Sequence, residues 1–461
     1  MNASSSTSAT GLRFTHPHLA VVLGGGFTGM LAAAALSAHA DVIVVERERL
    51  PRTPALPTDL PQARHAHLLS ADGARTVEEL LPGVVERWLD EGARPMPLPS
   101  GPAGPAPQGR LSRRPAQCVI ACSRDLLDRV VREQVPALEA VTVLDGTEAE
   151  ELTGTAEHIT GVRVRDTVTG SVRRLDADLV IDATGRHSTT PGRLTTLGLP
   201  AVREELADCG IVSATRIFRA PPGTENCPVI TARSSPESRQ DPGRTATLVP
   251  IEGGRWLVTL TGTGDGRPSA HADRFVPFAR RIPHSVIGDL IADAEPLSEV
   301  RVTRDTASRL RRYEQLRSWP TGFVVLGGAV AAFTPDYGQG LSIAAHSALA
   351  LRDALRRRGL DDPALARTVQ QSLARIARAP WTPATGRQLP SAPAGPRPSA
   401  ATRFVRDAVN GMLGTAIGRP PVCRAYVDVI TSTTPTTRIA RPSGSVSLPA
   451  APTGRRRPAE R

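Results

Sequence analysis

The chain has 461 residues and a formal net charge of +11, and it contains no lysine, so arginine alone supplies the permanent positive charge. The absence of lysine excludes a Schiff-base enzyme and a lysine-containing phosphate-binding loop, because both need that side chain. Aromatic residues make up only 3% of the chain and the arginines are spread along it, so we expect no nucleic-acid partner.

The first predicted elements form a βαβ unit. HLAVVLGGG is an apolar run that ends in glycines and predicts a strand, GMLAAAALSAHA consists of good helix formers, and DVIVVERE is a second β-branched run. This order is typical of the start of a doubly wound α/β sheet. A polar loop and a further helix follow, up to about residue 80.

The next part of the chain predicts a surface loop, a helix and a return to the sheet. Residues 95–116 are rich in proline, glycine and arginine and predict the loop, and residues 123–135 predict the helix. The runs VTVLDGTEAEEL, HITGVRVRD and SVRRLDADLVIDATG predict a three-stranded meander that leads back into the main sheet.

A β-rich stretch over 205–263 predicts a separate antiparallel sheet inserted into the first fold, followed by helices over about 270–298. RVTRDTASRLRRYE and GFVVLGG return to strand, and a long helix is expected from Gly340 to about Arg358. The proline-rich stretch 386–400 predicts a linker, and one more helix is expected near 401–416.

The cysteines and the N-terminal sequence indicate in which cellular compartment the protein is expected. Five cysteines at irregular spacing make no disulfide framework, and Cys118 and Cys122 lack the second ligand pair of a zinc site. The N-terminus has no apolar core of signal-peptide type, and no apolar run reaches the ~18 residues of a membrane span. We therefore expect a cytoplasmic protein with no metal and no membrane partner.

A glycine motif follows the first strand. Gly24, Gly26 and Gly29 are spaced as GxGxxG, which allows a tight turn, close approach to a pyrophosphate and close packing of helix on strand. The second strand ends in Glu46, 22 residues after Gly24, close to the ~20 expected for a ribose-binding acid. Its charge disfavours NADP and leaves NAD or FAD at this site. The adjoining residues of the same predicted site are Phe27, Thr28 and Arg47.

A second constellation lies far along the chain, within residues 322–355. A strand ends at Gly327 and Gly328, a loop with Pro335 and Gly338 follows, and a long helix begins near Gly340 and Leu341. Reduced flavin carries negative charge near N1, and a helix N-terminus stabilises it. A plain NAD dehydrogenase has no use for this second helix, so the pair of motifs favours FAD.

The two motifs together resemble the class A flavoprotein monooxygenases, over about residues 19–360, and imply their p-hydroxybenzoate hydroxylase fold. In that family a GD-x-A-x-x-x-x-P-x-x-G-x-G motif lies at the flavin, and Ala329 to Gly340 keep its pattern. The chain departs from it at Gly328, where the family has an aspartate on the ribityl chain, and at Thr334. A charge-assisted bond is worth about 1.5–3 kcal/mol, so the departure predicts FAD binding weaker by roughly one to two orders of magnitude.

Three segments, 61–83, 118–134 and 209–223, resemble more narrowly the actinomycete epoxidases that act on the polyene precursors of monensin and lasalocid. The similarity fades after about residue 360. By this resemblance Arg124 reaches the FAD phosphates or ribityl chain, and Arg64 lies near the flavin. ADLVIDATGRHS is similar to the family's DG motif and implies a cofactor role for Asp182 and Gly185, beside Arg186. His65 and His67 are interpreted as structural or pocket-lining residues.

The resemblance implies an NADPH- or NADH-dependent enzyme in which a C4a-hydroperoxyflavin epoxidises a linear polyketide for polyether biosynthesis. The flavin carries the chemistry, so no catalytic side chain is expected. The small-molecule substrate, free or on a carrier protein, is expected between the β-rich region and the flavin, against Trp256, Phe333 and Tyr337. The alternatives are hydroxylation of an aromatic polyketide, a flavin-poor binding protein disabled at Gly328, and an NAD dehydrogenase.

The predicted fold is therefore a doubly wound FAD-binding α/β domain with an inserted antiparallel substrate sheet and a helical C-terminal part. The predicted regions are a disordered tail (1–18), the FAD-binding domain (19–204 and 299–360), the substrate domain (205–298), a helical region with its linker (361–435) and a second disordered tail (436–461).

Overall fold

The computed structural model describes residues 15–50, 65–97, 118–225, 227–234, 243–282, 285–334 and 339–388. Four of the predicted site residues, Arg64, Pro335, Tyr337 and Gly338, lie outside these ranges, as do nearly all of the predicted linker and the predicted helix at 401–416.

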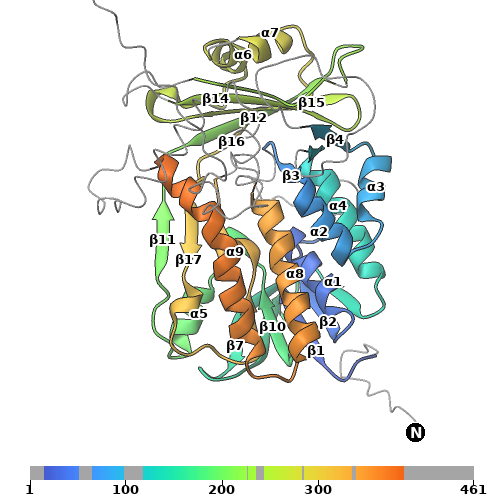
Figure 1. Cartoon of the computed structure of the whole chain (residues 1–461), viewed down its shortest axis with the longest axis vertical. Coiled ribbons are helices and arrows are strands. Elements are labelled where there is room, and N and C mark those ends of the chain that lie inside the picture. Colours follow the sequence, from blue (N-terminus) through green and yellow to red (C-terminus); the bar gives the residue numbers. More distant parts are fainter. Residues whose placement is uncertain are drawn as a thin grey trace, which may run out of the picture.

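A five-stranded parallel sheet forms the centre of the larger part of the molecule (Figure 1). In spatial order its strands are β18 (Phe323–Val325), β10 (Leu179–Asp182), β1 (Leu19–Leu23), β2 (Asp41–Val45) and β6 (Val141–Leu144). Nearly every residue of β1, β2, β10 and β18 is buried, as expected of parallel strands covered on both faces. The runs around Val21 and Val44 thus form the strands that the sequence predicts.

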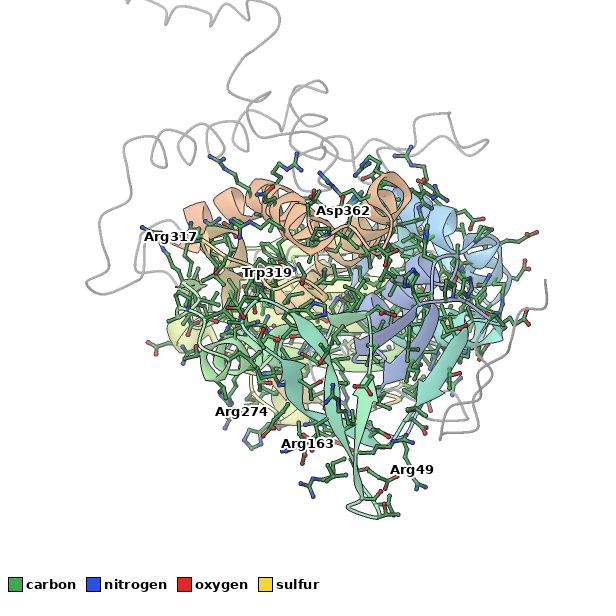
Figure 2. All side chains as sticks on the ribbon, turned by 90° about the horizontal axis from the view of Figure 1, so that it is seen from below. Arg49, Arg163, Arg274, Arg317, Trp319 and Asp362 are labelled. Carbon is green, nitrogen blue, oxygen red and sulfur yellow. The ribbon has the colours of Figure 1, made fainter. Side chains whose placement is uncertain are left out.

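Helices cover one face of this sheet and a β-meander covers the other (Figure 2). The long helix α8 (Gly340–Arg358) packs on α1 (Phe27–Leu36), α2 (Ala71–Leu80) and α9 (Leu365–Gln388). The other helices of this part are α3 (Val84–Asp90), α4 (Arg124–Gln134) and α5 (Thr190–Thr196). The predicted long helix begins and ends at the expected residues.

The meander consists of β7 (Thr147–Gly154), β8 (Ile159–Asp166) and β9 (Val172–Asp176). The prediction placed VTVL in the meander, and this is corrected: VTVL is β6, which pairs in parallel with β2 from Val42↔Val141 to Val45↔Leu144. The correction has a simple cause, because the apolar residues of β6 complete the edge of the buried sheet, whereas the polar TEAEEL stretch suits the exposed meander.

A second, antiparallel sheet lies across the carboxyl ends of the parallel strands (Figure 1). In spatial order its strands are β13 (Ile230–Arg233), β14 (Arg244–Ile251), β15 (Arg255–Gly262), β12 (Val212–Arg219) and β16 (Arg301–Thr303). The helices α6 (Ala272–Arg280) and α7 (Val286–Leu290) cover its outer face. This is the predicted inserted sheet, and its last strand, β16, comes after residue 298.

Two small antiparallel sheets connect the two parts. One consists of β3 (Leu68–Ser70), β5 (Cys118–Ala121) and β4 (Arg94–Pro97), and the other of β11 (Glu204–Ala207), β17 (Ser308–Arg311) and β19 (Ala331–Ala332). Within the described ranges, none of the helices combines the length and the hydropathy needed to cross a bilayer.

Candidate FAD and substrate site

Four loops leave the parallel sheet at one edge. The register pairs Leu23 with Val45 and Asp182, and Asp182 with Val325. Because parallel strands end at the same edge, the segments that follow these residues emerge side by side. Segments from residues 24, 46, 183 and 326 onward, which are far apart in the chain, therefore meet at one place.

The glycine turn has the geometry that its spacing predicts. Gly24 has φ +98°, in the region that favours glycine, and its N–H donates to Val45 O at 2.8 Å. A Cβ at Gly29 would lie 1.8 Å from Gly24 O, so α1 packs directly on the turn. A Cβ at Gly26 would meet no atom within 4 Å. Gly24 and Gly29 are thus needed by the fold, and Gly26 leaves room in front of the helix.

Glu46 lies against this turn. Its carboxylate accepts hydrogen bonds from Gly25 N–H at 2.6 Å and from Glu48 N–H at 2.9 Å. A carboxylate has about four acceptor positions, so capacity for a ribose hydroxyl remains. Arg47, the next residue, is exposed at the same edge.

Arg124 is the first residue of α4 and lies beside the start of α1. Its guanidinium lies over the Phe27 ring, 5.2 Å from the ring centre, and its Nε donates to Asp128 at 2.7 Å. The ion pair uses one edge of the guanidinium fork and fixes its orientation. The predicted phosphate-directed arginine is thereby held next to the glycine turn.

The loop after β18 packs on the same turn from the other side. A Cβ at Gly327 would lie 2.6 Å from Thr28 Cγ2, so the two segments are in close contact. A Cβ at Gly328 would lie 3.3 Å from Gly185 Cα, in the loop after β10. The first-motif helix, the DG-like loop and the Gly328 loop thus form one contiguous group.

Two buried arginines fix the Gly328 loop. Arg311 donates to Ala329 O at 2.9 Å and to Arg186 O at 3.0 Å, and Arg186 donates to Phe333 O at 3.0 Å. Each guanidinium satisfies main-chain carbonyls that burial would otherwise leave unpaired, which costs about 1–3 kcal/mol per group. The sequence did not single out Arg311 as a positioning residue, because its partners, two main-chain carbonyls and the Glu204 carboxylate at 3.0 Å, lie far from it in the chain.

Asp182 is fully buried, and both of its carboxylate oxygens bond within its own loop. One accepts from Thr184 N–H at 2.8 Å and from the Thr184 hydroxyl at 2.6 Å, and the other accepts from the hydroxyls of Ser188 and Thr190. The carboxylate is therefore a positioning group that shapes the loop around Gly185, and its four bonds leave it no further role as a direct ligand.

The long helix α8 starts at Gly340, whose Cβ position is open, and Leu341 is buried beneath it. The Ser70 and Ser342 hydroxyls hydrogen-bond at 2.8 Å and tie this first turn to α2. The first turn of a helix presents N–H groups that have no partner within the helix, and its positive dipole end favours an electron-rich ligand.

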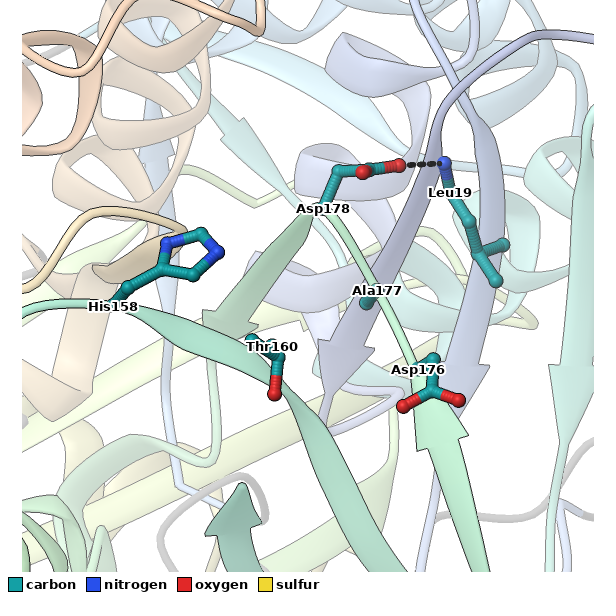
Figure 3. A pocket seen from close by; sticks show the side chains of 6 residues that line it. All are labelled: Leu19, His158, Thr160, Asp176, Ala177 and Asp178. Atoms are coloured by element: carbon teal, nitrogen blue, oxygen red, sulfur yellow. Dashed lines mark hydrogen bonds between the residues drawn. The ribbon is translucent and has the colours of Figure 1, made fainter. Parts of the chain in front are cut away.

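Figure 3 shows a surface pocket of about 380 Å³ near Leu19, His158, Thr160 and Asp178. Leu19 opens β1 and Asp178 precedes β10, so this pocket lies at the amino ends of the parallel strands. It is thus at the edge opposite to the four loops and is not the predicted site.

Comparison with known proteins identifies the family. Residues 19–377, most of the chain, match the family model described as an FAD binding domain. The chain belongs to the FAD binding domain family. Protein Rv3254 of Mycobacterium tuberculosis is 31% identical over 350 residues, covering 74% of this chain and 73% of the relative. Kynurenine 3-monooxygenase of Salinispora arenicola is 28% identical over 360 residues, covering 73% and 72%.

Solved structures extend the comparison to the fold. The flavin-dependent brominase Bmp2 superposes with a TM-score of 0.65 at 12% identity, covering 90% of this chain and 94% of that one. The predicted fold class and the general similarity to class A flavin monooxygenases are thereby confirmed. The narrower affiliation with polyether epoxidases stays a prediction.

The residues at this site are suited to bind FAD. The open Cβ position at Gly26 leaves the approach that a pyrophosphate needs, and Glu46 and Arg124 supply a ribose acceptor and a phosphate partner beside it. The start of α8 at Gly340 offers a second positive dipole end. The described residues contain no cluster of histidine, cysteine or acidic side chains suited to a metal.

One predicted pocket-wall residue lies in a core instead, and that expectation is corrected. Trp256 is fully buried on the outer face of the antiparallel sheet, among the residues that pack under α6 and α7. Alternation along β15 turns Leu257, not Trp256, toward the FAD-binding part. Phe333 packs edge-on against Trp381 of α9, with ring centres 6.1 Å apart, and its place at the pocket wall stays a prediction.

The inner face of the antiparallel sheet carries a polar strip that the sequence reading missed. The strip consists of Ser213, Thr215 and Thr259, all buried, with His65 packed against it. His65 Nδ1 and Thr215 Oγ1 lie 2.6 Å apart, and Thr215 and Thr259 hydroxyls 2.7 Å apart. A signal was present, because hydroxyl residues alternate with apolar ones in IVSATRIF and WLVTLTGT.

Burial and the nearby charge of His67 lower the pKa of His65 from 6.5 to about 4. The folded state therefore holds the neutral ring, and the stability that this confers is present above the unfolded pKa of 6.5 and is lost as the pH falls toward 4.

We expect acidification across this window to lower the free energy of unfolding by about 2–3 kcal/mol through His65 alone. Unfolding midpoints of the wild type and of His65→Asn, followed from neutral to acid pH, should converge as the pH falls. In the exposed His158→Gln variant the unfolding midpoint should fall with pH as steeply as in wild type. An equally steep fall in His65→Asn would contradict the prediction.

Proposed function

We propose that the protein is an FAD-dependent monooxygenase that epoxidises alkenes of a linear polyketide, with NADPH or NADH as a transient reductant. The observation that carries the proposal is the meeting of four cofactor-directed loops at one edge of the parallel sheet, with the inner face of the antiparallel sheet across it. Family membership and a relative named as a monooxygenase support the general reaction class.

Different residues of the chain bind different parts of the cofactor. The first turn of α1 at Gly26 and the Arg124 guanidinium receive the pyrophosphate, Glu46 accepts from the ribose, and the start of α8 receives the flavin ring. Arg311 and Arg186 hold the Gly328 loop in place for the ring. The chemistry that bound, reduced FAD would supply is the activation of molecular oxygen, one atom of which is transferred to the substrate.

The chain contributes orientation and exclusion of water at the substrate. Leu257, Val249 and Ile251 of the antiparallel sheet pack with Ala121 of β5 in a buried apolar cluster between the two parts. Oxygen transfer to an alkene needs no protein nucleophile, so an apolar wall with few polar groups suits the reaction. The substrate is a small polyketide, either free or on a carrier protein.

Product analysis tests the proposal. Purified protein supplied with FAD, NADPH or NADH and a linear polyene should consume oxygen and release an epoxide. Addition of catalase separates coupled transfer from simple oxidase activity. Oxygen uptake with no epoxide, together with a hydroxylated product from an aromatic polyketide, would replace the substrate class by the aromatic alternative. Absence of flavin absorbance after addition of FAD would reject the monooxygenase itself.

A further inference from the structure

The polar strip on the inner face of the antiparallel sheet contains two buried polar atoms without a hydrogen-bond partner among the described residues. They are Nε2 of His65 and the hydroxyl of Ser213, in side chains that are 1% and 0% exposed. A buried polar group with no partner costs about 1–3 kcal/mol, so two on one face call for an explanation.

The hydrogen bonds around His65 favour one position of the proton on the ring. Ala66 N–H donates a hydrogen bond to Thr259 Oγ1 at 2.9 Å. The Thr259 hydroxyl can then donate to Thr215 Oγ1, and the Thr215 hydroxyl can donate to His65 Nδ1. The reverse direction would leave the Thr259 hydrogen without an acceptor. The satisfied arrangement makes Nδ1 an acceptor and leaves Nε2–H as an unused donor.

Ser213 and Thr215 lie two residues apart on β12 and therefore point to the same face, about 7 Å apart along the strand. The start of this strand is tied to the flavin-directed loop, because the Thr306 hydroxyl donates to Ile211 O at 2.7 Å and Thr306 O accepts from the Thr334 hydroxyl at 2.8 Å. The strip thus runs from His65 toward the loop that contains Gly328.

We propose that His65 Nε2–H and the Ser213 hydroxyl bind oxygen atoms of the substrate, so that the site selects an uncharged, oxygen-bearing chain over a plain hydrocarbon. This rests on the proposed function for the class of substrate. A carbonyl or hydroxyl oxygen accepts from the imidazole, and Ser213 donates to or accepts from a second oxygen further along the chain. The apolar residues beside the strip contact the carbon skeleton.

Three variants separate binding from folding. In His65→Asn the amide replaces Nδ1 and keeps the Thr215 bond while Nε2 is lost, whereas His65→Gln places an amide near Nε2 and retains a donor. Ser213→Ala removes a hydroxyl with no partner in the described structure, so the unliganded protein should melt at an unchanged or slightly higher temperature.

The probes are a linear polyene that carries a ketone and, further along the chain, a hydroxyl, and the polyene hydrocarbon of equal length. Their Kd is measured by equilibrium dialysis against the FAD-loaded protein without reductant. Wild type should bind the hydroxyketone at least roughly tenfold more tightly, His65→Asn and Ser213→Ala should each lose most of that preference, and His65→Gln should keep part of it. Equal Kd values for the two probes in wild type, or a preference that all variants retain, would overturn the proposal. Because no turnover occurs, this result is independent of whether the protein forms an epoxide.

Discussion

Gly29→Ala is expected to weaken FAD binding and to lower the melting temperature of the protein by several degrees. The added Cβ would lie 1.8 Å from Gly24 O and 3.0 Å from Gly24 C, so α1 and the glycine turn must separate. Overpacking against rigid backbone costs about 1–3 kcal/mol, although alanine is intrinsically better than glycine in a helix by about 1 kcal/mol. We expect FAD to bind at least roughly 100-fold more weakly, measured by flavin fluorescence, and the unfolding midpoint of the apoprotein to fall.

Gly26→Ala is the matched control, since it adds the same methyl group three residues away. Gly26 has φ −76°, which alanine adopts freely, and its Cβ position is open in the polypeptide. The apoprotein should therefore melt within a degree or two of wild type, because an N-cap change from glycine to alanine costs less than about 1 kcal/mol. Its FAD affinity should still fall, because the methyl group occupies the approach of the pyrophosphate. Unchanged FAD affinity in both variants would show that the cofactor lies elsewhere.

The sequence predicts the parts of the site that depend on local geometry. The spacing of Gly24, Gly26 and Gly29 encodes a turn and a helix start within one βαβ unit, and Glu46 follows from the length of that unit. The long helix at Gly340 is predicted for the same reason, because a strand, a glycine-containing loop and a helix succeed one another directly in the chain. The structure places all of these where the patterns indicate.

The parts that the sequence did not predict depend on contacts between distant segments. His65 meets Thr215 across 150 residues and its neighbour Ala66 meets Thr259 across 193 residues, and no local pattern records these pairings. Trp256 was misplaced because a large aromatic residue suits a pocket wall and a core equally well. Only the register of β15 decides which face it occupies, and a shift of one residue reverses the answer.

Aspartate at position 328 should strengthen FAD binding by roughly 10- to 100-fold, the equivalent of about 1.4–2.7 kcal/mol. The family that the sequence resembles has a carboxylate at this position on the ribityl chain, and Gly328 provides none. A Cβ here would lie 3.3 Å from Gly185 Cα and 3.5 Å from Arg186 N, so the loop after β10 must yield by a few tenths of an ångström. A Cβ at Gly185 itself would meet no atom within 4 Å, so space is open beside that residue.

Gly328→Ala separates the two effects of that substitution, because it adds the same Cβ without the carboxylate. The alanine variant should bind FAD no better than wild type, or slightly worse, while the aspartate variant binds it more tightly, as titrated by quenching of flavin fluorescence. If both variants lose affinity equally, crowding against Gly185 dominates, and the loop is built around glycine. If wild type binds no flavin and Gly328→Asp restores it, the natural chain is a flavin-poor binding protein of this fold, and the oxygen-transfer function belongs only to its relatives. Tight binding by wild type, improved further by the carboxylate, instead supports an enzyme in which the helix starts at Gly26 and Gly340 and the Arg124 guanidinium already hold the cofactor.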